Sequence, residues 1–123
     1  PPPGDDDLDA KATLRFFARV RGMDAIEQRC RDRLELVGLD SDRRTPVRGY
    51  STGRAQRLKI AQALLHDPEV LFLDEPGSNL DPAGKGWLGD YVQDLATAGK
   101  TIILATNDRD EMDWGRNHVT LAG

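Results

Sequence analysis

The sequence has 123 residues, of which 38% are apolar and 31% are charged, and its formal net charge is −4. This length suits about one domain with a modest core, and the apolar content excludes a chain that is disordered throughout. No segment approaches the roughly 18–20 consecutive apolar residues of a membrane-spanning helix, so we expect no transmembrane segment. The lone cysteine, Cys30, excludes an internal disulfide and fits a reducing compartment.

Charge is unevenly distributed along the chain. Residues 11–67 contain thirteen Lys and Arg against seven Asp and Glu, whereas residues 68–123 contain four against ten. A basic half can indicate a nucleic-acid-binding surface. Here, however, the basic residues are interleaved with acidic ones, and few aromatics lie among them for base stacking. Solvated helix faces are therefore the favoured interpretation.

The Pro- and Asp-rich residues 1–8 begin without Met and are interpreted as a linker or a cut end.

Two amphipathic helices are predicted in the first third of the chain. Asp9 can cap the first helix, which Gly22 ends, and Asp24 begins a capping-box pattern for the second, which Gly38 ends. Apolar residues that recur at helical spacing form the expected core faces: Leu14, Phe17 and Ala18 in the first helix, and Ile26, Cys30, Leu34 and Val37 in the second.

The rest of the chain alternates between strands and helices. Residues 40–50 predict a loop, and a third helix is expected from about residue 54 to residue 66. A continuous apolar run at 70–73 predicts a strand buried on both faces. Asp81 and Pro82 begin a helix that ends before Gly99. A strand at 101–106, a short helix at 109–114 and a last strand at 118–122 follow. This order predicts an α/β fold with a parallel sheet after a helical first half.

Polar side chains follow both buried strands of the predicted sheet. Asp74 and Glu75 come directly after the first strand, and Asn107 and Asp108 follow the second. Ligands bind at the carboxyl ends of strands in parallel sheets. Adjacent carboxylates point in different directions, so one can serve a metal ion while the other faces a water molecule. A solvated acidic turn is the alternative interpretation.

A second candidate site precedes the third predicted helix. Residues 49–54, Gly-Tyr-Ser-Thr-Gly-Arg, would place exposed backbone amides and hydroxyl groups at a helix N-terminus, where anions bind. Simple helix capping by Ser51 or Thr52 explains the same pattern.

The order and spacing of these motifs resemble the second half of an ATP-binding cassette (ABC) transporter ATPase, from about residue 8 to the end. Residues 50–54 resemble the signature motif, 71–74 Walker B, and 78–81 (Ser-Asn-Leu-Asp) the D-loop. The resemblance implies part of a P-loop NTPase fold. Residues 9–67 would form the helical subdomain with the signature helix, and residues 68–123 the C-terminal part of a RecA-like α/β core.

The resemblance also implies a role for each site residue. Asp74 would hold Mg²⁺ through water, and Glu75 would polarise the water that attacks the γ-phosphate of ATP. Asp81 would lie at a dimer interface and help to link two sites. The γ-phosphate of ATP bound to a partner cassette would contact the signature residues Ser51, Thr52, Gly53 and Arg54.

The implied function is ATP hydrolysis that powers transport across a membrane. The stretch from Leu14 to Arg19 is similar to that of export-type cassettes. The implied partners are a second ABC ATPase subunit, identical or different, and a transmembrane permease, which the helices at 10–37 would face. No nucleic acid is expected as a partner. The chain would then lie in the cytoplasm, at the inner face of the membrane.

Three departures from the family pattern leave alternatives open. Asn107 stands where the family's switch-loop histidine falls, and an amide cannot carry a proton or a positive charge. We therefore expect slower hydrolysis, or a tolerated variant. Thr52 and Arg54 replace the usual Gly and Gln. No segment matches the phosphate loop G-x-x-x-x-G-K-[ST], so this chain alone is not expected to hydrolyse ATP.

Two alternatives remain open, one based on these departures and the other on the basic first half of the chain. The first is a catalytically impaired, cassette-derived binding or regulatory module, which Asn107 and the unmatched phosphate loop favour. The second is a nucleic-acid-associated ABC ATPase. Residues 78–81 argue against it, because they lack the histidine that ribosome-acting members tend to show at the D-loop.

Overall fold

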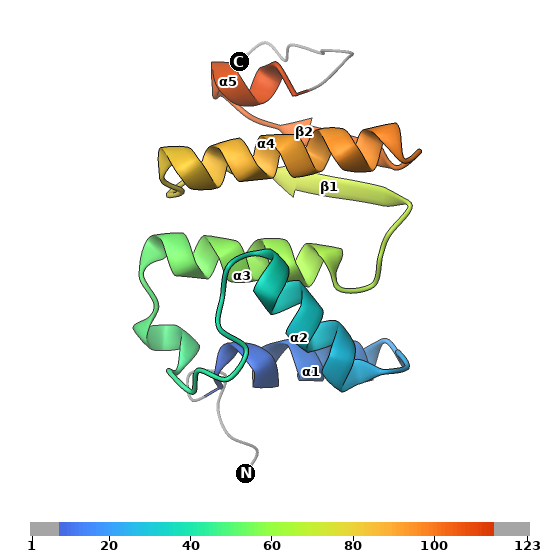
Figure 1. Ribbon diagram of the computed structural model, residues 1–123, viewed down its shortest axis with the longest axis vertical. Helices are drawn as coiled ribbons and strands as arrows, with labels where there is room; N and C mark the ends of the chain where they lie inside the picture. Colours follow the sequence, from blue (N-terminus) through green and yellow to red (C-terminus); the bar gives the residue numbers. More distant parts are fainter. Residues whose placement is uncertain (1–7, 115–123) are drawn as a thin grey trace. The chain divides into compact units, whose positions relative to one another are not determined.

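The computed structural model describes residues 8–114, which fall into two compact units divided between Asp67 and Pro68 (Figure 1). The first unit is helical, and the second contains a small parallel sheet with helices. None of the helices described between residues 8 and 114 has the length and apolar character needed to cross a membrane.

The first unit consists of three helices and one short turn. They are α1 (Ala10–Val20), α2 (Ile26–Leu36), the 3-10 turn η2 (Val47–Gly49) and α3 (Thr52–Leu64). Each of the three α-helices packs against the other two. Small and branched apolar side chains fill the space between them, as the helical spacing predicts: Leu14, Ala18, Cys30, Leu34, Val37, Leu58, Ala61 and Leu64 are buried.

Glycines end three of the helices as predicted. Gly22, Gly38 and Gly99 follow α1, α2 and the later helix α4 (Pro82–Thr97), and all three have a positive φ that other residues rarely adopt. After α2, the N–H of Gly38 donates to Glu35 O and the N–H of Leu39 donates to Leu34 O. This is the Schellman arrangement, which satisfies carbonyls that the helix leaves open.

Two arginines join the ends of α2 and α3. Arg33 of α2 donates from Nε to Leu64 O at the end of α3, at 2.8 Å. Arg57 of α3 donates from Nη1 to Val37 O at the end of α2, also at 2.8 Å. A Cβ on Gly38 would lie 3.2 Å from Arg57 Nη1, so the glycine also leaves room for this guanidinium. Each helix therefore supplies the cation that stabilises the other's C-terminus.

Four details of the first unit correct the sequence predictions. Phe17 is 41% exposed instead of lying in the core. Asp24 does not cap α2, which begins after Ala25 at a φ of 51° without a side-chain cap. Glu27 forms an ion pair with Arg15 of α1, so the expected capping box is replaced by a contact between helices. The third helix runs from Thr52 to Leu64, not from 54 to 66, because Ser51 caps it. The predicted loop at 40–50 contains η2.

The second unit contains β1 (Val70–Asp74), α4, β2 (Thr101–Ala105) and α5 (Arg109–Met112). β1 and β2 are parallel neighbours, with Val70 opposite Thr101 and Asp74 opposite Ala105. The chain passes from β1 through α4 to β2, and α4 packs against β2. Asp81 caps α4 by accepting from Gly84 N at 2.8 Å, and Pro82 follows it, as predicted. The α/β fold with a parallel sheet and flanking helices is thus confirmed.

The burial of the strands differs from the prediction. In β1, Leu71 and Leu73 are buried, whereas Val70 and Phe72 are 56% and 59% exposed. In β2, Ile103 lies opposite Phe72 and is 48% exposed. Among residues 8–114, the sheet therefore has one covered face and one open apolar face. The strand predicted at 118–122 lies outside the described residues, as do residues 1–7.

Candidate functional site

The site begins where both strands leave the sheet at the same edge. Asp74 ends β1 opposite Ala105, which ends β2, and the side chain of Asp74 is exposed. The next residue, Glu75, donates its backbone N–H to Ala105 O at 2.7 Å. Glu75 has a φ of 46°, a left-handed conformation that is strained for a residue with a Cβ. Such strain costs on the order of 1–3 kcal/mol and is concentrated at functional sites.

Glu75 contacts the segment that follows β2. Its Oε1 accepts a hydrogen bond from the backbone N–H of Asn107 at 3.0 Å. The structure thus brings together two candidate residues that are 32 positions apart in the sequence and follow different strands. Because Asn107 uses its backbone, its own exposed side chain remains available to a ligand at this edge.

A tight turn connects Glu75 to α4. Ser78 N donates to Glu75 O and Leu80 N donates to Gly77 O, both at 3.1 Å. Asn79 has a φ of 65°, a left-handed conformation that asparagine tolerates better than most residues. The turn ends at Asp81, whose side chain caps α4, so Glu75 and Asp81 lie at the two ends of one ordered segment.

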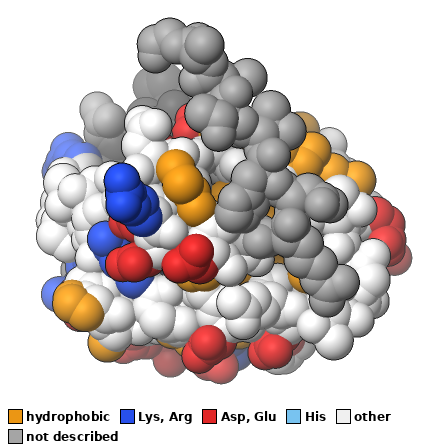
Figure 2. Space-filling model, turned by 90° about the horizontal axis from the view of Figure 1, so that it is seen from above, with side chains coloured by type: hydrophobic (Ala, Val, Ile, Leu, Met, Phe, Trp, Pro, Cys, Tyr) orange, Lys and Arg blue, Asp and Glu red, His pale blue; other side chains and the backbone are white. Residues whose placement is uncertain are grey.

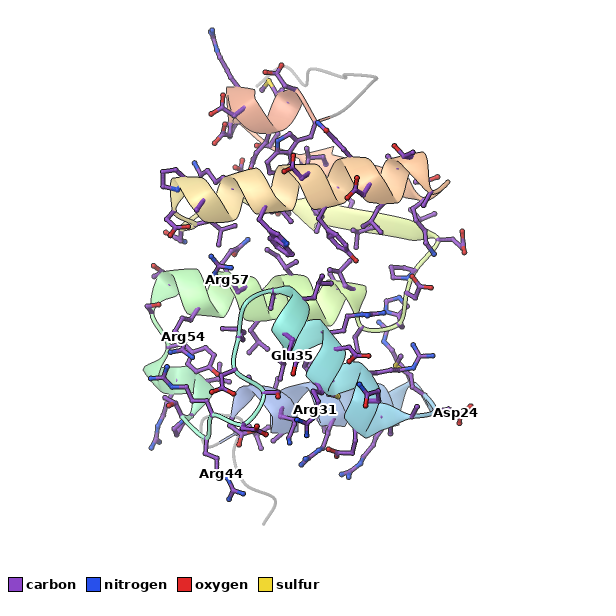
Figure 3. All side chains as sticks on the ribbon, in the orientation of Figure 1. Asp24, Arg31, Glu35, Arg44, Arg54 and Arg57 are labelled. Atoms are coloured by element: carbon purple, nitrogen blue, oxygen red, sulfur yellow. The ribbon has the colours of Figure 1, made fainter. Side chains whose placement is uncertain are left out.

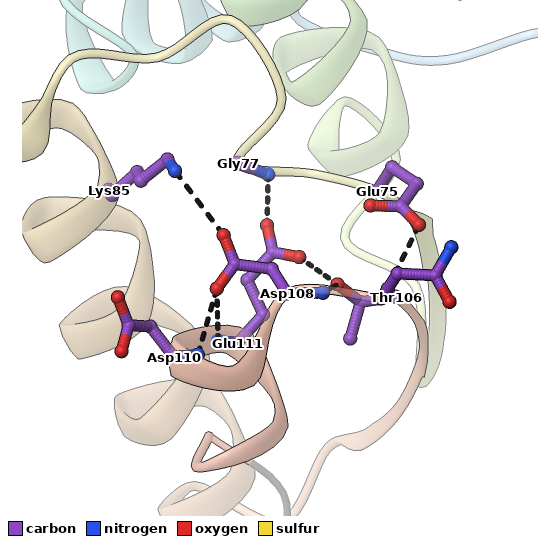
Figure 4. A network of polar contacts seen from close by, with 8 residues as sticks. Glu75, Gly77, Lys85, Thr106, Asp108, Asp110 and Glu111 are labelled. Atoms are coloured by element: carbon purple, nitrogen blue, oxygen red, sulfur yellow. Dashed lines mark hydrogen bonds and ion pairs between the residues drawn. The ribbon is translucent and has the colours of Figure 1, made fainter. Parts of the chain in front are cut away.

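Asp108 caps α5 and pairs with α4. Its carboxylate accepts from Asp110 N at 2.8 Å and forms an ion pair with Lys85 Nζ at 3.3 Å (Figure 4). The hydrogen bond from Asp110 and then the Lys85 ammonium hold the pKa of Asp108 below its usual value. The sequence predicted a polar strand end here, but it gave no sign of the pairing with Lys85.

Glu111 is the residue that the sequence reasoning missed. It is 1% exposed, and its carboxylate accepts from Gly77 N at 2.5 Å and from the hydroxyl of Thr106. The spacing from Asp108 to Glu111 matches a capping box, which would direct Glu111 to the backbone N–H of Asp108. That N–H donates instead to Thr106 Oγ1, at 2.9 Å. The local signal was therefore present but indicated a different partner.

The signature-like residues lie at the start of α3. Ser51 Oγ accepts from Arg54 N at 3.2 Å, which makes Ser51 the helix cap. Thr52 is exposed and Gly53 half-buried. The Arg54 guanidinium lies over the ring of Tyr50, 4.8 Å from its centre, a cation–π contact. Arg54 and Arg57 both project from α3 in Figure 3.

The candidate residues therefore form two groups. Asp74, Glu75 and Asn107 lie at one edge of the sheet, and Asp81 ends the turn beside it. The other group is the capped N-terminus of α3 in the first unit, with Ser51, Thr52, Gly53 and Arg54. The structure describes each group within its own unit.

The residues at the sheet edge fit a Mg²⁺ ion that takes only part of its coordination shell from the protein. Within residues 8–114, no group of three or more His, Cys, Asp or Glu side chains could hold a metal. Mg²⁺ is usually bound through one or two carboxylates and keeps waters and phosphate oxygens as its other ligands. Asp74 supplies one exposed carboxylate of this kind, so the donor set suits a metal that arrives with a phosphorylated ligand.

Comparisons with known proteins agree with this geometry. A family model described as ABC transporter matches residues 5–78, more than half of the chain. A daunorubicin resistance ATP-binding protein, DrrA3, from Streptomyces coeruleorubidus is 39% identical over 95% of this chain and 38% of its own length. A Nod factor export ATP-binding protein I from Cupriavidus metallidurans is 36% identical over 94% of this chain and 39% of its length.

Two further matches extend this result. A fluoroquinolones export ATP-binding protein of Mycobacterium tuberculosis is 44% identical over 81% of the chain and 33% of its length. The chain thus spans between 33% and 39% of these relatives. The dimeric structure of MJ0796, a bacterial ABC transporter cassette, superimposes with a TM-score of 0.80 at 21% identity. The superposition covers 89% of this chain and 50% of the MJ0796 chain, which shows that the two share a fold. The chain belongs to the ABC transporter family.

Proposed function

We propose that this chain forms part of an ABC ATPase that hydrolyses ATP to power export across a membrane. The observation that carries the proposal is the hydrogen bond from Asn107 N–H to Glu75 Oε1. It fixes the orientation of a carboxylate at the end of β1, next to the exposed Asp74. The names of three relatives, which concern daunorubicin resistance, Nod factor export and fluoroquinolone export, support an export role.

Each site residue would have a separate task. Glu75 would accept a proton from, and orient, the water that attacks the γ-phosphate of ATP. Asp74 would hold Mg²⁺, which when bound neutralises charge that develops on the phosphate oxygens. The N–H groups at the start of α3, around Ser51 and Gly53, would contact the γ-phosphate of ATP held by a second cassette.

The proposed partners follow from this division of the site. A second ABC ATPase subunit would complete the nucleotide site, with Asp81 near the contact between the two cassettes. A transmembrane permease would supply substrate specificity, and the assembly would lie in the cytoplasm at the inner face of the membrane. The helices α1 and α2 of the first unit would face the permease. No nucleic acid is expected, and on the face seen in Figure 2 basic side chains lie next to acidic ones without a continuous basic area.

A catalytically impaired regulatory module is the second candidate. Asn107 favours it, because the amide side chain cannot carry the proton or charge that a histidine provides at this position. The names of the same three relatives, which are ATP-binding proteins of resistance or export systems, lend it no support. We therefore place the chain in an active ATPase whose turnover Asn107 slows.

The test is ATP hydrolysis by the protein as its gene encodes it, including any residues that precede Pro1. Glu75→Gln removes the proton acceptor and keeps the size of the side chain, so we expect kcat to fall by about 100-fold or more. Binding of ATP should be retained.

Glu69→Gln is the matched control. Glu69 precedes β1 at the opposite end of the strand, and its exposed side chain pairs only with Lys100 among the contacts that the structure gives it. We expect its kcat to stay within about twofold of the parent value, because exposed ion pairs contribute little. Equal losses in both variants would contradict the role of Glu75, and absence of Mg²⁺-dependent ATP hydrolysis in the parent would contradict the proposed function.

A further inference from the structure

We propose that Glu111 is a positioning residue for hydrolysis: its carboxylate joins the turn after Glu75 to the segment that carries Asn107. We call this contact the Glu111 clasp, formed by Glu111, Gly77 and Thr106. The proposal deepens the proposed function and rests on it for its catalytic consequence, whereas the clasp itself can be tested without nucleotide.

The burial of Glu111 is the first observation. A carboxylate is rarely fully buried unless polar partners replace the water that it loses. Glu111 is 1% exposed and has two donors, the backbone N–H of Gly77 at 2.5 Å and the hydroxyl of Thr106. Hydrogen bonds to a charged group are about twice as strong as bonds between neutral groups. The clasp is therefore a strong link, formed by a buried carboxylate.

The positions of the two donors are the second observation. Gly77 lies two residues after Glu75, and Thr106 lies one residue before Asn107. The clasp therefore joins the same two segments that meet in the hydrogen bond between Asn107 N and Glu75 Oε1 (Figure 4). If the clasp opens, the exposed hydrogen bond from Asn107 N to Glu75 Oε1 loses the buried contact that supports it.

Gly77 shows how closely the clasp is built. A Cβ at this position would collide with Oε1 of Glu111 and would lie 3.3 Å from its Cδ. Gly77 does not have a positive φ, so a demand on backbone conformation does not explain the residue. The close approach of the carboxylate explains it.

Glu111 also does not serve its own helix. At its position in the first turn of α5 it could accept from Asp108 N, but Thr106 Oγ1 accepts that N–H. The neighbouring ion pair between Lys85 and Asp108 braces the same region from α4, but its side chains are 39% and 29% exposed. Exposed pairs contribute little, so this ion pair should add less than the buried clasp.

The first test is hydrogen exchange measured by NMR on the full chain without nucleotide. In Glu111→Ala we expect the amides of both Gly77 and Asn107 to exchange at least about tenfold faster than in the parent. Glu111→Gln keeps an acceptor for Gly77 N–H, so it should restore most of the protection. Asp110→Ala is the control, because it removes a charge from the same turn of α5 while its side chain makes none of the clasp contacts.

Thr106→Val provides a second route if Glu111→Ala does not fold. It preserves the shape of the side chain but removes the hydroxyl, which donates to Glu111 and accepts from Asp108 N. Asn107 N–H should therefore exchange faster while Gly77 N–H stays protected. Unchanged exchange at Asn107 in Glu111→Ala or Thr106→Val would overturn the proposal. Equal effects in Glu111→Ala and Asp110→Ala would also overturn it.

The second test is ATP hydrolysis by the protein as its gene encodes it. A positioning role predicts that Glu111→Ala lowers kcat about tenfold with little change in KM for ATP, and that Glu111→Gln restores it. Equal changes in kcat and KM, or no rescue by Gln, would overturn the catalytic consequence. If the parent itself hydrolyses no ATP, the proposed function fails, while the exchange experiment still decides whether the clasp exists.

Discussion

Asn107 contacts Glu75 through its backbone N–H, and its side chain is exposed. A substitution at this position can therefore change the chemistry of the site without breaking that hydrogen bond. We predict that Asn107→His increases kcat for ATP roughly tenfold, because an imidazole can carry a proton and a positive charge, and tenfold corresponds to about 1.4 kcal/mol. Steady-state ATP hydrolysis by the protein as its gene encodes it measures the effect.

Arg109→His is the control for this prediction. It places an imidazole two residues further along, on the exposed surface of α5, where no gain is expected. An Asn107→His variant that is no faster than the parent would show that position 107 does not limit hydrolysis.

Asp108 gives the second unit a pH-dependent contribution to stability. Its pKa is lowered in the folded chain by Asp110 N–H and Lys85, whereas in the unfolded chain it returns to about 3.9. The stabilisation is therefore fully present above the unfolded-state pKa and is lost as the pH falls through the lower folded-state value. We predict that Asp108→Asn is less stable than the parent at pH 7 and that the difference shrinks below about pH 4.

Urea unfolding followed by circular dichroism at a series of pH values measures this difference. Asp110→Asn is the control, because the Asp110 side chain has none of these partners. A constant difference between Asp108→Asn and the parent from pH 7 to pH 3 would contradict the prediction.

At the scale of the elements, the paired arginines tie α2 to α3. Arg33→Met keeps the aliphatic stem and removes the hydrogen bond to Leu64 O. We predict a loss of about 1 kcal/mol in the free energy of unfolding, since bonds to charged donors contribute about 1.5–3 kcal/mol and Asp67 N also donates to this carbonyl.

Arg31→Met on the same helix is the matched control. Arg31 Nη1 lies 3.8 Å from Asp42 Oδ1, and both side chains are exposed. The loss in the free energy of unfolding should therefore stay below about 0.5 kcal/mol. Urea titration of both variants tests the difference. Equal losses of unfolding free energy in Arg33→Met and Arg31→Met would show that the hydrogen bond from Arg33 to Leu64 O adds no specific stability.

Local signals predicted the elements best where local chemistry decides them. Gly22, Gly38 and Gly99 end their helices because a positive φ and two backbone hydrogen bonds need only neighbouring residues. Asp24 is not the cap because α2 begins after Ala25, and the capping box is absent because Glu27 pairs with Arg15 on a different helix. A contact between helices is invisible to a four-residue pattern.

At the scale of the whole molecule, the motif order predicted the α/β fold and the family, and register explains why the candidate residues meet. Asp74 and Ala105 end parallel strands at one level, so the segments that follow must lie side by side. Glu111 escaped prediction because its partners, Gly77 and Thr106, come from two other segments. The open face with Val70, Phe72 and Ile103 escaped too, because a run of apolar residues does not reveal which strand faces are covered.

Each of α2 and α3 supplies an arginine to the C-terminal end of the other, and this limits where the chain can change in length. One residue inserted into either helix would rotate its arginine by about 100° around the helix axis and remove it from the opposite carbonyl. Insertions in related genes should therefore fall between the helices, in residues 39–46, where the chain can lengthen without moving Arg33 or Arg57. The two helices would then be inherited as a pair of fixed length, joined by a connection that is free to diverge.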